Sequence, residues 1–122
     1  MKKILIVDDE AEVRELIKAS LDKTEYTTLL AESGDQALEV CKTEKPDLIL
    51  LDIAMPMMDG YQVCQKLKQD SKTSGIPVLF LTGKDLDPRG IIERGESLGA
   101  CGYIPKPSTL KELLEKIKEV LR

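Results

Sequence analysis

The chain has 122 residues, of which 42% are hydrophobic and 33% are charged, and this is the size and composition of one globular domain. Its net charge is −4 and basic residues alternate with acidic ones, so we expect no direct binding to nucleic acid or to an anionic membrane. The chain contains no histidine, which excludes every mechanism that needs an imidazole base or ligand.

Three cysteines, Cys41, Cys64 and Cys101, lie far apart and lack the C-x-x-C spacing of a zinc or redox motif. We interpret them as small hydrophobic residues of the core. The apolar run after Lys2 and Lys3 is too short for a signal sequence, and no other run approaches membrane-spanning length. These features predict a cytoplasmic protein in a reducing compartment, without a membrane partner.

Short apolar runs alternate with helical patterns along the whole chain. Runs that lack polar alternation are typical of strands buried on both faces of a parallel sheet. The strands are expected at residues 4–7, 26–31, 48–52, 76–81 and 102–104. The second of these runs is rich in threonine and less apolar, which predicts an edge position.

Helices are expected between these strands, because apolar residues recur there at helical spacing. Capping-box signatures predict the starts of three helices: Ser33 with Gln36, Asp59 with Gln62, and Thr109 with Glu112. The helix around residues 91–98 has the weakest signal, since glycines lower its propensity, and the last helix has the clearest apolar stripe.

Five strands alternating with five helices predict an α/β fold, a doubly wound five-stranded parallel sheet with right-handed crossovers and helices on both faces. Of the known doubly wound strand orders, the flavodoxin-like order 2-1-3-4-5 fits best. It puts the polar second strand at an edge and the first, third and fourth strands in the centre. The first and third strands are then neighbours.

Residues suited to phosphoryl chemistry follow the carboxyl ends of these strands, where open α/β sheets bind ligands. Asp8 and Asp9 follow the first strand and Asp52 ends the third, so three carboxylates would share one crevice. Such carboxylates repel one another unless a cation lies among them, and Mg²⁺ prefers oxygen ligands. Thr82 and Lys106 end the fourth and fifth strands, and their hydroxyl and ammonium groups, with a metal, would hold a phosphoryl group.

Each of these residues also has an ordinary structural interpretation. Asp9 would cap a helix, Asp8, Asp52 and Thr82 would form turns, and Lys106 would be a solvated surface charge. We favour a shared site because all five fall at strand ends on one edge of the sheet.

The pattern resembles that of the receiver domains of two-component response regulators, over the whole chain. The matching segments are IVDDE, LLDIAMPMMDG, FLTG and GYIPKP. The resemblance implies one receiver domain at residues 1–122, in which Asp52 accepts a phosphoryl group from a histidine kinase or phosphotransfer protein. It also implies that Asp9, Asp52 and the backbone carbonyl of Ala54 bind Mg²⁺, with Asp8 acting through water.

The resemblance further implies a conformational switch. Thr82 and Lys106 would contact the phosphoryl oxygens, and Thr82 would move inward and leave space into which Tyr103 turns. The helix at 91–98, the last strand and the final helix would then form the face that binds a downstream protein or effector domain. The domain would be a monomer or a phosphorylation-dependent dimer, and it would catalyse only its own phosphoryl transfer and dephosphorylation.

Other classes of protein are less consistent with the sequence. An FMN-binding flavodoxin would need a phosphate-binding loop after the first strand and aromatic residues to stack the flavin. This sequence has two aspartates after the first strand and no tryptophan. A P-loop nucleoside triphosphatase is disfavoured because Gly83 and Lys84 lack the first glycine of that loop. A magnesium-dependent phosphohydrolase, which also forms an aspartyl-phosphate, and a receiver-like interaction module that does not switch remain the alternatives.

Overall fold

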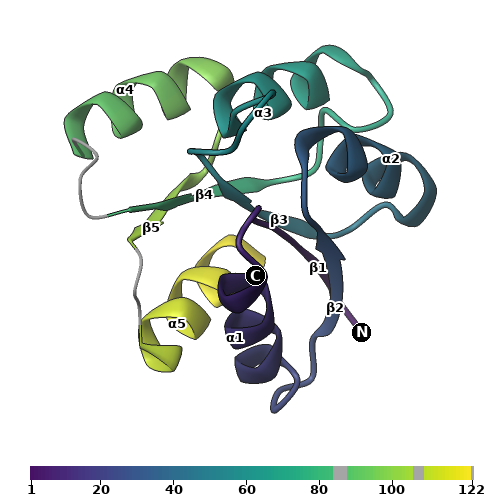
Figure 1. Ribbon diagram of the computed structural model, residues 1–122, viewed down its shortest axis with the longest axis vertical. Helices are drawn as coiled ribbons and strands as arrows, with labels where there is room; N and C mark the ends of the chain where they lie inside the picture. The colour runs from purple at the N-terminus through teal and green to yellow at the C-terminus, as the bar shows by residue number, and fades with distance from the viewer. Residues whose placement is uncertain (84–87, 106–108, 122) are drawn as a thin grey trace.

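The computed structural model of the chain describes residues 1–83, 88–105 and 109–121, and Figure 1 shows its arrangement. The described strands are β1 (Lys3–Val7), β2 (Thr27–Ala31), β3 (Leu48–Asp52), β4 (Val78–Thr82) and β5 (Gly102–Pro105). The described helices are α1 (Ala11–Leu21), α2 (Gly34–Glu44), α3 (Gly60–Gln69), α4 (Pro88–Leu98) and α5 (Leu110–Leu121). All strand pairs are parallel and the order is β2-β1-β3-β4-β5, which confirms the predicted fold class.

Helices cover both faces of the sheet, with α1 and α5 on one face and α2, α3 and α4 on the other (Figure 1). Successive side chains of a strand point to opposite faces. In β1, Leu5 and Val7 therefore join the core cluster beneath α2, α3 and α4, whereas Ile4 and Ile6 join the cluster beneath α1 and α5. Both faces of the central strands are buried, which explains why their sequences do not alternate.

Two strands begin later than the apolar runs predicted. The N–H of Tyr26 donates to the Thr24 hydroxyl at 3.2 Å, so this residue belongs to a turn before β2. Ile76 and Pro77 precede β4, and Pro77 has no N–H to donate to a neighbouring strand. Its carbonyl still accepts from the N–H of Ile49 at 3.0 Å, which aligns β4 with β3.

Two of the predicted capping boxes differ in their reciprocal hydrogen bond. At α3 the box is complete, since the Gln62 N–H donates to the Asp59 carboxylate and the Asp59 N–H donates to the Gln62 side chain, both at 2.9 Å. At α2 the Gln36 N–H donates to the Ser33 hydroxyl at 3.2 Å, but the Gln36 side chain accepts from the N–H of Glu32. The reciprocal bond of this capping box therefore comes from the N–H of Glu32 and not from that of Ser33.

At α5 the N–H of Glu112 donates to the Thr109 hydroxyl at 3.1 Å, as the capping signature predicts. The same hydroxyl donates to the Glu112 carboxylate, also at 3.1 Å. The side chain of Glu112 thus bonds to the capping hydroxyl, and the start of α5 is fixed by a side-chain pair.

The three cysteines do not share one environment. Cys41 and Cys64 are buried in the core, and burial raises the pKa of the Cys41 thiol to about 11. Cys101 is exposed, so the prediction of a core position was wrong for this residue. It follows the turn after α4 and directly precedes β5, the outer strand of the sheet.

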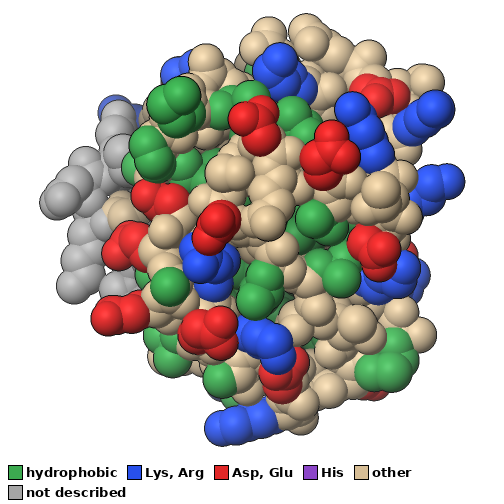
Figure 2. Space-filling model, turned by 45° about the vertical axis from the view of Figure 1, so that its right-hand side comes forward, with side chains coloured by type: hydrophobic (Ala, Val, Ile, Leu, Met, Phe, Trp, Pro, Cys, Tyr) green, Lys and Arg blue, Asp and Glu red, His purple; other side chains and the backbone are tan. Residues whose placement is uncertain are grey.

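On the face that Figure 2 shows, the distribution of charged side chains matches the alternation of basic and acidic residues in the sequence. Acidic and basic side chains are interleaved there, with small hydrophobic areas between them. No helix within the described ranges is long and apolar enough to cross a membrane.

Candidate functional site

The pairing of β1 with β3 brings two predicted site residues to the same edge of the sheet. Val7 is level with Leu51 in this pair, so Asp8 and Asp52 are the next residues on two adjacent strands. Asp8 has an exposed fraction of 0% and Asp52 of 3%. Two buried carboxylates at neighbouring strand ends are the arrangement that the sequence predicted.

The carboxylates after β1 form a group of acidic side chains that could hold a cation. Asp8, Asp9 and Glu10 each offer one oxygen, and these oxygens lie within 4.8 Å of one another. In the described ranges, no group of three such oxygens at this spacing includes Asp52. Asp9 and Glu10 are exposed, so an ion bound by these oxygens could keep several waters, as Mg²⁺ does in proteins.

Glu10 was not predicted as a member of this group, although it directly follows the aspartate pair in the IVDDE segment. Its backbone is extended and it occupies the N-cap position of α1 without a side-chain cap. Asp9 therefore does not cap α1, and its ordinary structural interpretation was wrong. Both side chains remain exposed beside Asp8.

Asp8 is held in place by its neighbours. Its carboxylate accepts from the N–H of Glu10 at 2.9 Å, and its carbonyl accepts from the Arg14 guanidinium at 2.6 Å. Its own N–H donates to the Ala31 carbonyl at 3.2 Å. These bonds join Asp8 to the end of β2 and to the first turns of α1, so its carboxylate has a fixed position on the edge.

The segment after Asp52 packs tightly against the end of β3 because residue 60 is glycine. The Gly60 N–H donates to the Ile53 carbonyl at 2.8 Å, which closes the loop. A Cβ on Gly60 would clash with the carbonyl oxygen of Asp52 and would lie 2.8 Å from Cα of Ile53. The start of α3 therefore fixes the backbone of the candidate acceptor.

Ala54 lies in this loop, two residues after the end of β3, and is exposed. Further along, the N–H of Met58 donates to the Pro56 carbonyl at 2.8 Å and Met57 has a φ of 71°. This i to i+2 hydrogen bond around a residue with positive φ is that of a γ-turn, which is a strained conformation. The Met57 side chain is fully exposed at the tip.

Thr82 and Lys106 were predicted to complete the site. Thr82 is the last residue of β4 and has an exposed fraction of 3%. Asp52 is level with Leu81, so Thr82 is the next residue along the strand beside the acceptor. Lys106 lies outside the described residues, and its predicted contact stays a prediction.

Tyr103, the predicted switch residue, is partly buried in β5 and pairs with Phe80 of β4. Phe80 also meets Tyr61 of α3 edge to face, with ring centroids 5.2 Å apart. The guanidinium of Arg94 on α4 lies 4.2 Å from the Tyr61 ring centroid. These side chains connect α3, α4 and the outer strands, and no spacing in the sequence signals the pairing of Tyr61 with Arg94.

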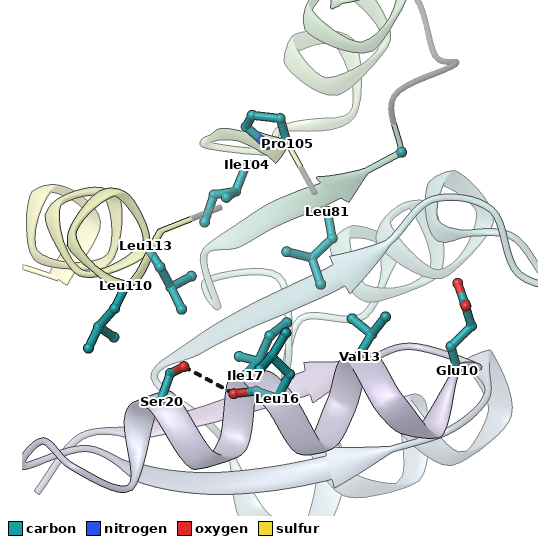
Figure 3. Close-up of a pocket in the computed structure, with 11 residues that line it drawn as sticks. Glu10, Val13, Leu16, Ile17, Ser20, Leu81, Ile104, Pro105, Leu110 and Leu113 are labelled. Atoms are coloured by element: carbon teal, nitrogen blue, oxygen red, sulfur yellow. Dashed lines mark hydrogen bonds between the residues drawn. The ribbon is translucent and has the colours of Figure 1, made fainter. Parts of the chain in front are cut away.

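We call the edge of the sheet that carries Asp8, Asp9, Glu10 and Asp52 the acidic edge. An apolar cavity of about 360 Å³ opens beside it, at Glu10 (Figure 3). Leu16 and Ile17 of α1 line it on one side, and Leu110 and Leu113 of α5 line it on the other. Leu16 is 66% exposed and Leu110 is 37% exposed, so the rim presents apolar surface to solvent. Glu10 belongs both to this cavity and to the acidic group, which makes the two features continuous.

The fold and the acidic edge together define a doubly wound α/β domain of the flavodoxin-like type with a group of carboxylates at the switch point. Residues 4–118 match the model of the response regulator receiver domain, and the chain belongs to this family. The resemblance noted from the sequence is thereby confirmed.

Known proteins similar to this chain include the phosphate regulon transcriptional regulatory protein PhoB of Pseudomonas aeruginosa, which is 44% identical over 99% of the chain and 52% of PhoB. The alkaline phosphatase synthesis transcriptional regulatory protein PhoP of Bacillus subtilis is 40% identical over 99% of the chain and 49% of PhoP. The chain thus spans about half the length of these relatives. Among solved structures, the chemotaxis protein CheY4 of Vibrio cholerae has a TM-score of 0.92 at 29% identity, covering 99% of both chains.

Proposed function

We propose that this chain is a phosphorylation-activated signalling switch, in which Asp52 accepts a phosphoryl group from a histidine kinase or a phosphotransfer protein. The main support is the position of Asp52, buried at the end of β3, with the buried Asp8 directly after the adjacent strand β1. In the transfer, a carboxylate oxygen of Asp52 bonds to phosphorus while the phosphorus–nitrogen bond of the donor histidine breaks. The imidazole leaves with the electron pair of that bond.

The carboxylates that follow β1 and end β3 would hold Mg²⁺ during this transfer. We assign Asp9, Asp52 and the backbone carbonyl of Ala54 as ligands, with Asp8 acting through water. When bound, the ion neutralises charge that builds up on the phosphoryl oxygens. The repulsion among the carboxylates supports this assignment, because a cation relieves it. Glu10 is a further oxygen donor at the exposed side of the group.

The switch would be set by the charge of the phosphoryl group, which is roughly −1.5 to −2 on a phosphorylated side chain at neutral pH. Thr82 and Lys106 would contact its oxygens, and movement of the Thr82 hydroxyl would let Tyr103 turn inward. The elements α4, β5 and α5, which lie together at one end of the sheet in Figure 1, would change with it. This face would bind a downstream protein or an attached effector domain in the cytoplasm.

Intact-mass measurement with Mg²⁺ and acetyl phosphate tests the acceptor. The chain should gain one phosphoryl group, and either removal of Mg²⁺ by a chelator or Asp52→Ala should abolish the gain. Asp47→Asn is the matched control, because Asp47 precedes β3 at its other end and asparagine can still accept from the Lys3 N–H, which donates to Asp47 at 2.7 Å. Undiminished labelling of Asp52→Ala would refute the assignment.

Two further measurements separate the alternatives. Sustained turnover of added phosphoesters would indicate a magnesium-dependent phosphohydrolase. Backbone amide NMR with beryllofluoride, which stands in for the phosphoryl group, tests the switch: we expect chemical-shift changes through α4, β5 and α5, including Tyr103. Changes confined to the acidic edge would indicate a receiver-like module that does not switch.

A further inference from the structure

Two of the three cysteines lie at the contact between α3 and the end of α4. Cys64 is buried on α3, and its sulfur lies 3.8 Å from the carbonyl oxygen of Leu98, the last residue of α4. Cys101 follows shortly after Leu98 and is exposed. A buried thiol and an accessible thiol therefore border the same turn of the chain.

This turn has a defined structure. Gly99 has a φ of 84° and its N–H donates to the Glu96 carbonyl at 3.1 Å, while the Ala100 N–H donates to the Gly95 carbonyl at 2.8 Å. These two bonds and the glycine with positive φ form a Schellman motif, which ends α4. The chain between Leu98 and Cys101 is therefore constrained.

Cys101 is also held by the sheet, because its N–H donates to the Val78 carbonyl at 2.8 Å. On the other side of the contact, Lys68 lies one turn after Cys64 on α3. The Lys68 Cε is 3.7 Å from the position that a Cβ on Gly99 would occupy. The face of α3 that carries Cys64 and Lys68 thus lies along the turn that leads to Cys101.

We propose that Cys64 and Cys101 are an oxidation-sensitive pair, which a hydroperoxide converts into a disulfide bond that joins α3 to the start of β5. This site is separate from the acidic edge and does not depend on the phosphorylation of Asp52. Neither cysteine belongs to a C-x-x-C motif, so the sequence alone did not indicate the pair.

The reaction has two steps with hydrogen peroxide as the oxidant. The exposed Cys101 thiolate attacks one peroxide oxygen, the oxygen–oxygen bond breaks, and the products are a sulfenic acid and, after protonation, water. The Cys64 sulfur then attacks the sulfenic sulfur, the sulfur–oxygen bond breaks, and a second water leaves. Two thiols and one peroxide thus give one disulfide and two waters.

The environments of the thiols fit this order. Burial raises the pKa of Cys64, so it is a poor first nucleophile, and the nearby Lys68 ammonium opposes this shift. A Cys101 thiolate would raise the Cys64 pKa further. Cys41 is buried on α2, and its raised pKa of about 11 makes it the unreactive reference thiol.

The test treats the folded full chain with hydrogen peroxide at neutral pH and measures intact mass and peptide maps without reductant. We expect the main product to lose the mass of two hydrogen atoms and to contain a peptide pair linked through Cys64 and Cys101. Cys101→Ser should abolish this product, whereas Cys41→Ser should leave it unchanged. In Cys64→Ser, Cys101 should stop at the sulfenic acid, which dimedone traps.

The outcomes are distinct. Because Cys101 is exposed, Cys101→Ser tests the pair even if a polar residue at the buried position 64 prevents folding. A wild-type chain whose Cys101 passes to sulfinic acid, or forms only disulfides between two chains, would overturn the proposal. A disulfide that contains Cys41 would overturn it as well.

Discussion

Substitution of Gly60 by alanine tests whether the start of α3 fixes the backbone of Asp52. The added methyl group would clash with the Asp52 carbonyl oxygen, and it would lie 2.8 Å from Cα of Ile53 and 3.0 Å from the Asp52 carbonyl carbon. These are backbone atoms and they cannot move aside as a flexible side chain does. The loop that the hydrogen bond from Gly60 to Ile53 closes must therefore shift.

Overpacking of this kind costs about 1–3 kcal/mol in free energy of unfolding. Each kcal/mol lowers the Tm of a domain of this length by roughly 4 °C, so we expect Gly60→Ala to melt about 4–12 °C below the wild type. The rate of phosphorylation by acetyl phosphate should fall as well, since the carboxylate moves with its backbone.

Gly75→Ala is the matched control, because no atom lies within 4 Å of the position of its Cβ and its φ is not positive. Both variants make the same chemical change, and alanine at residue 75 should leave the Tm unchanged or slightly raised, because it restricts the unfolded chain. Thermal unfolding followed by circular dichroism, with phosphorylation kinetics on the same samples, compares them. Equal stability and equal rates in the two variants would refute the reasoning.

Three further substitutions test other contacts. Asp59→Ala removes the side-chain acceptor of the α3 capping box and should lower the free energy of unfolding in urea by about 0.5–2 kcal/mol, and a value equal to the wild type would exclude a stabilising cap. Arg94→Ala should lower the free energy of unfolding by about 0.5–1 kcal/mol, because the contact with the Tyr61 ring is lost. Glu93→Ala, at the exposed residue next to Arg94, should leave this free energy unchanged. Equal losses in the two variants would argue against the contact. The folded state raises the pKa of Cys41 from 9.0 to about 11, so the neutral thiol stabilises the fold below pH 9.0 and this contribution is lost as the pH rises toward 11. Cys41→Ala should therefore lose less stability than the wild type over that pH range, and parallel curves would contradict this.

The sequence predicted the sheet because both faces of its central strands are covered by helices, and full burial leaves a continuous apolar run. It predicted the strand ends that carry Asp8, Asp52 and Thr82 for the same reason, since each run stops where the chain leaves the core. It was less accurate at the starts of β2 and β4. The hydrogen bond from the Tyr26 N–H to the Thr24 hydroxyl decides the first boundary, and Pro77 decides the second.

Contacts between distant residues could not be predicted in this way. The close approach of Gly60 to the Asp52 carbonyl depends on the path of the loop between them, which the pattern of apolar residues does not encode. The pairing of Tyr61 with Arg94 joins two surface helices whose relative position is set by the whole core. Cys101 was assigned to the core from residue type alone, whereas its exposure follows from its place at the sheet edge after the turn that ends α4.

The most direct test of the central proposal locates the phosphoryl group on the chain. After reaction with acetyl phosphate and Mg²⁺, borohydride reduces an aspartyl-phosphate to homoserine, and peptide mapping identifies the residue. We expect homoserine at Asp52, and none when the metal is chelated. Homoserine at Asp8 or Asp9 in place of Asp52, or no homoserine with the metal present, would contradict the proposal.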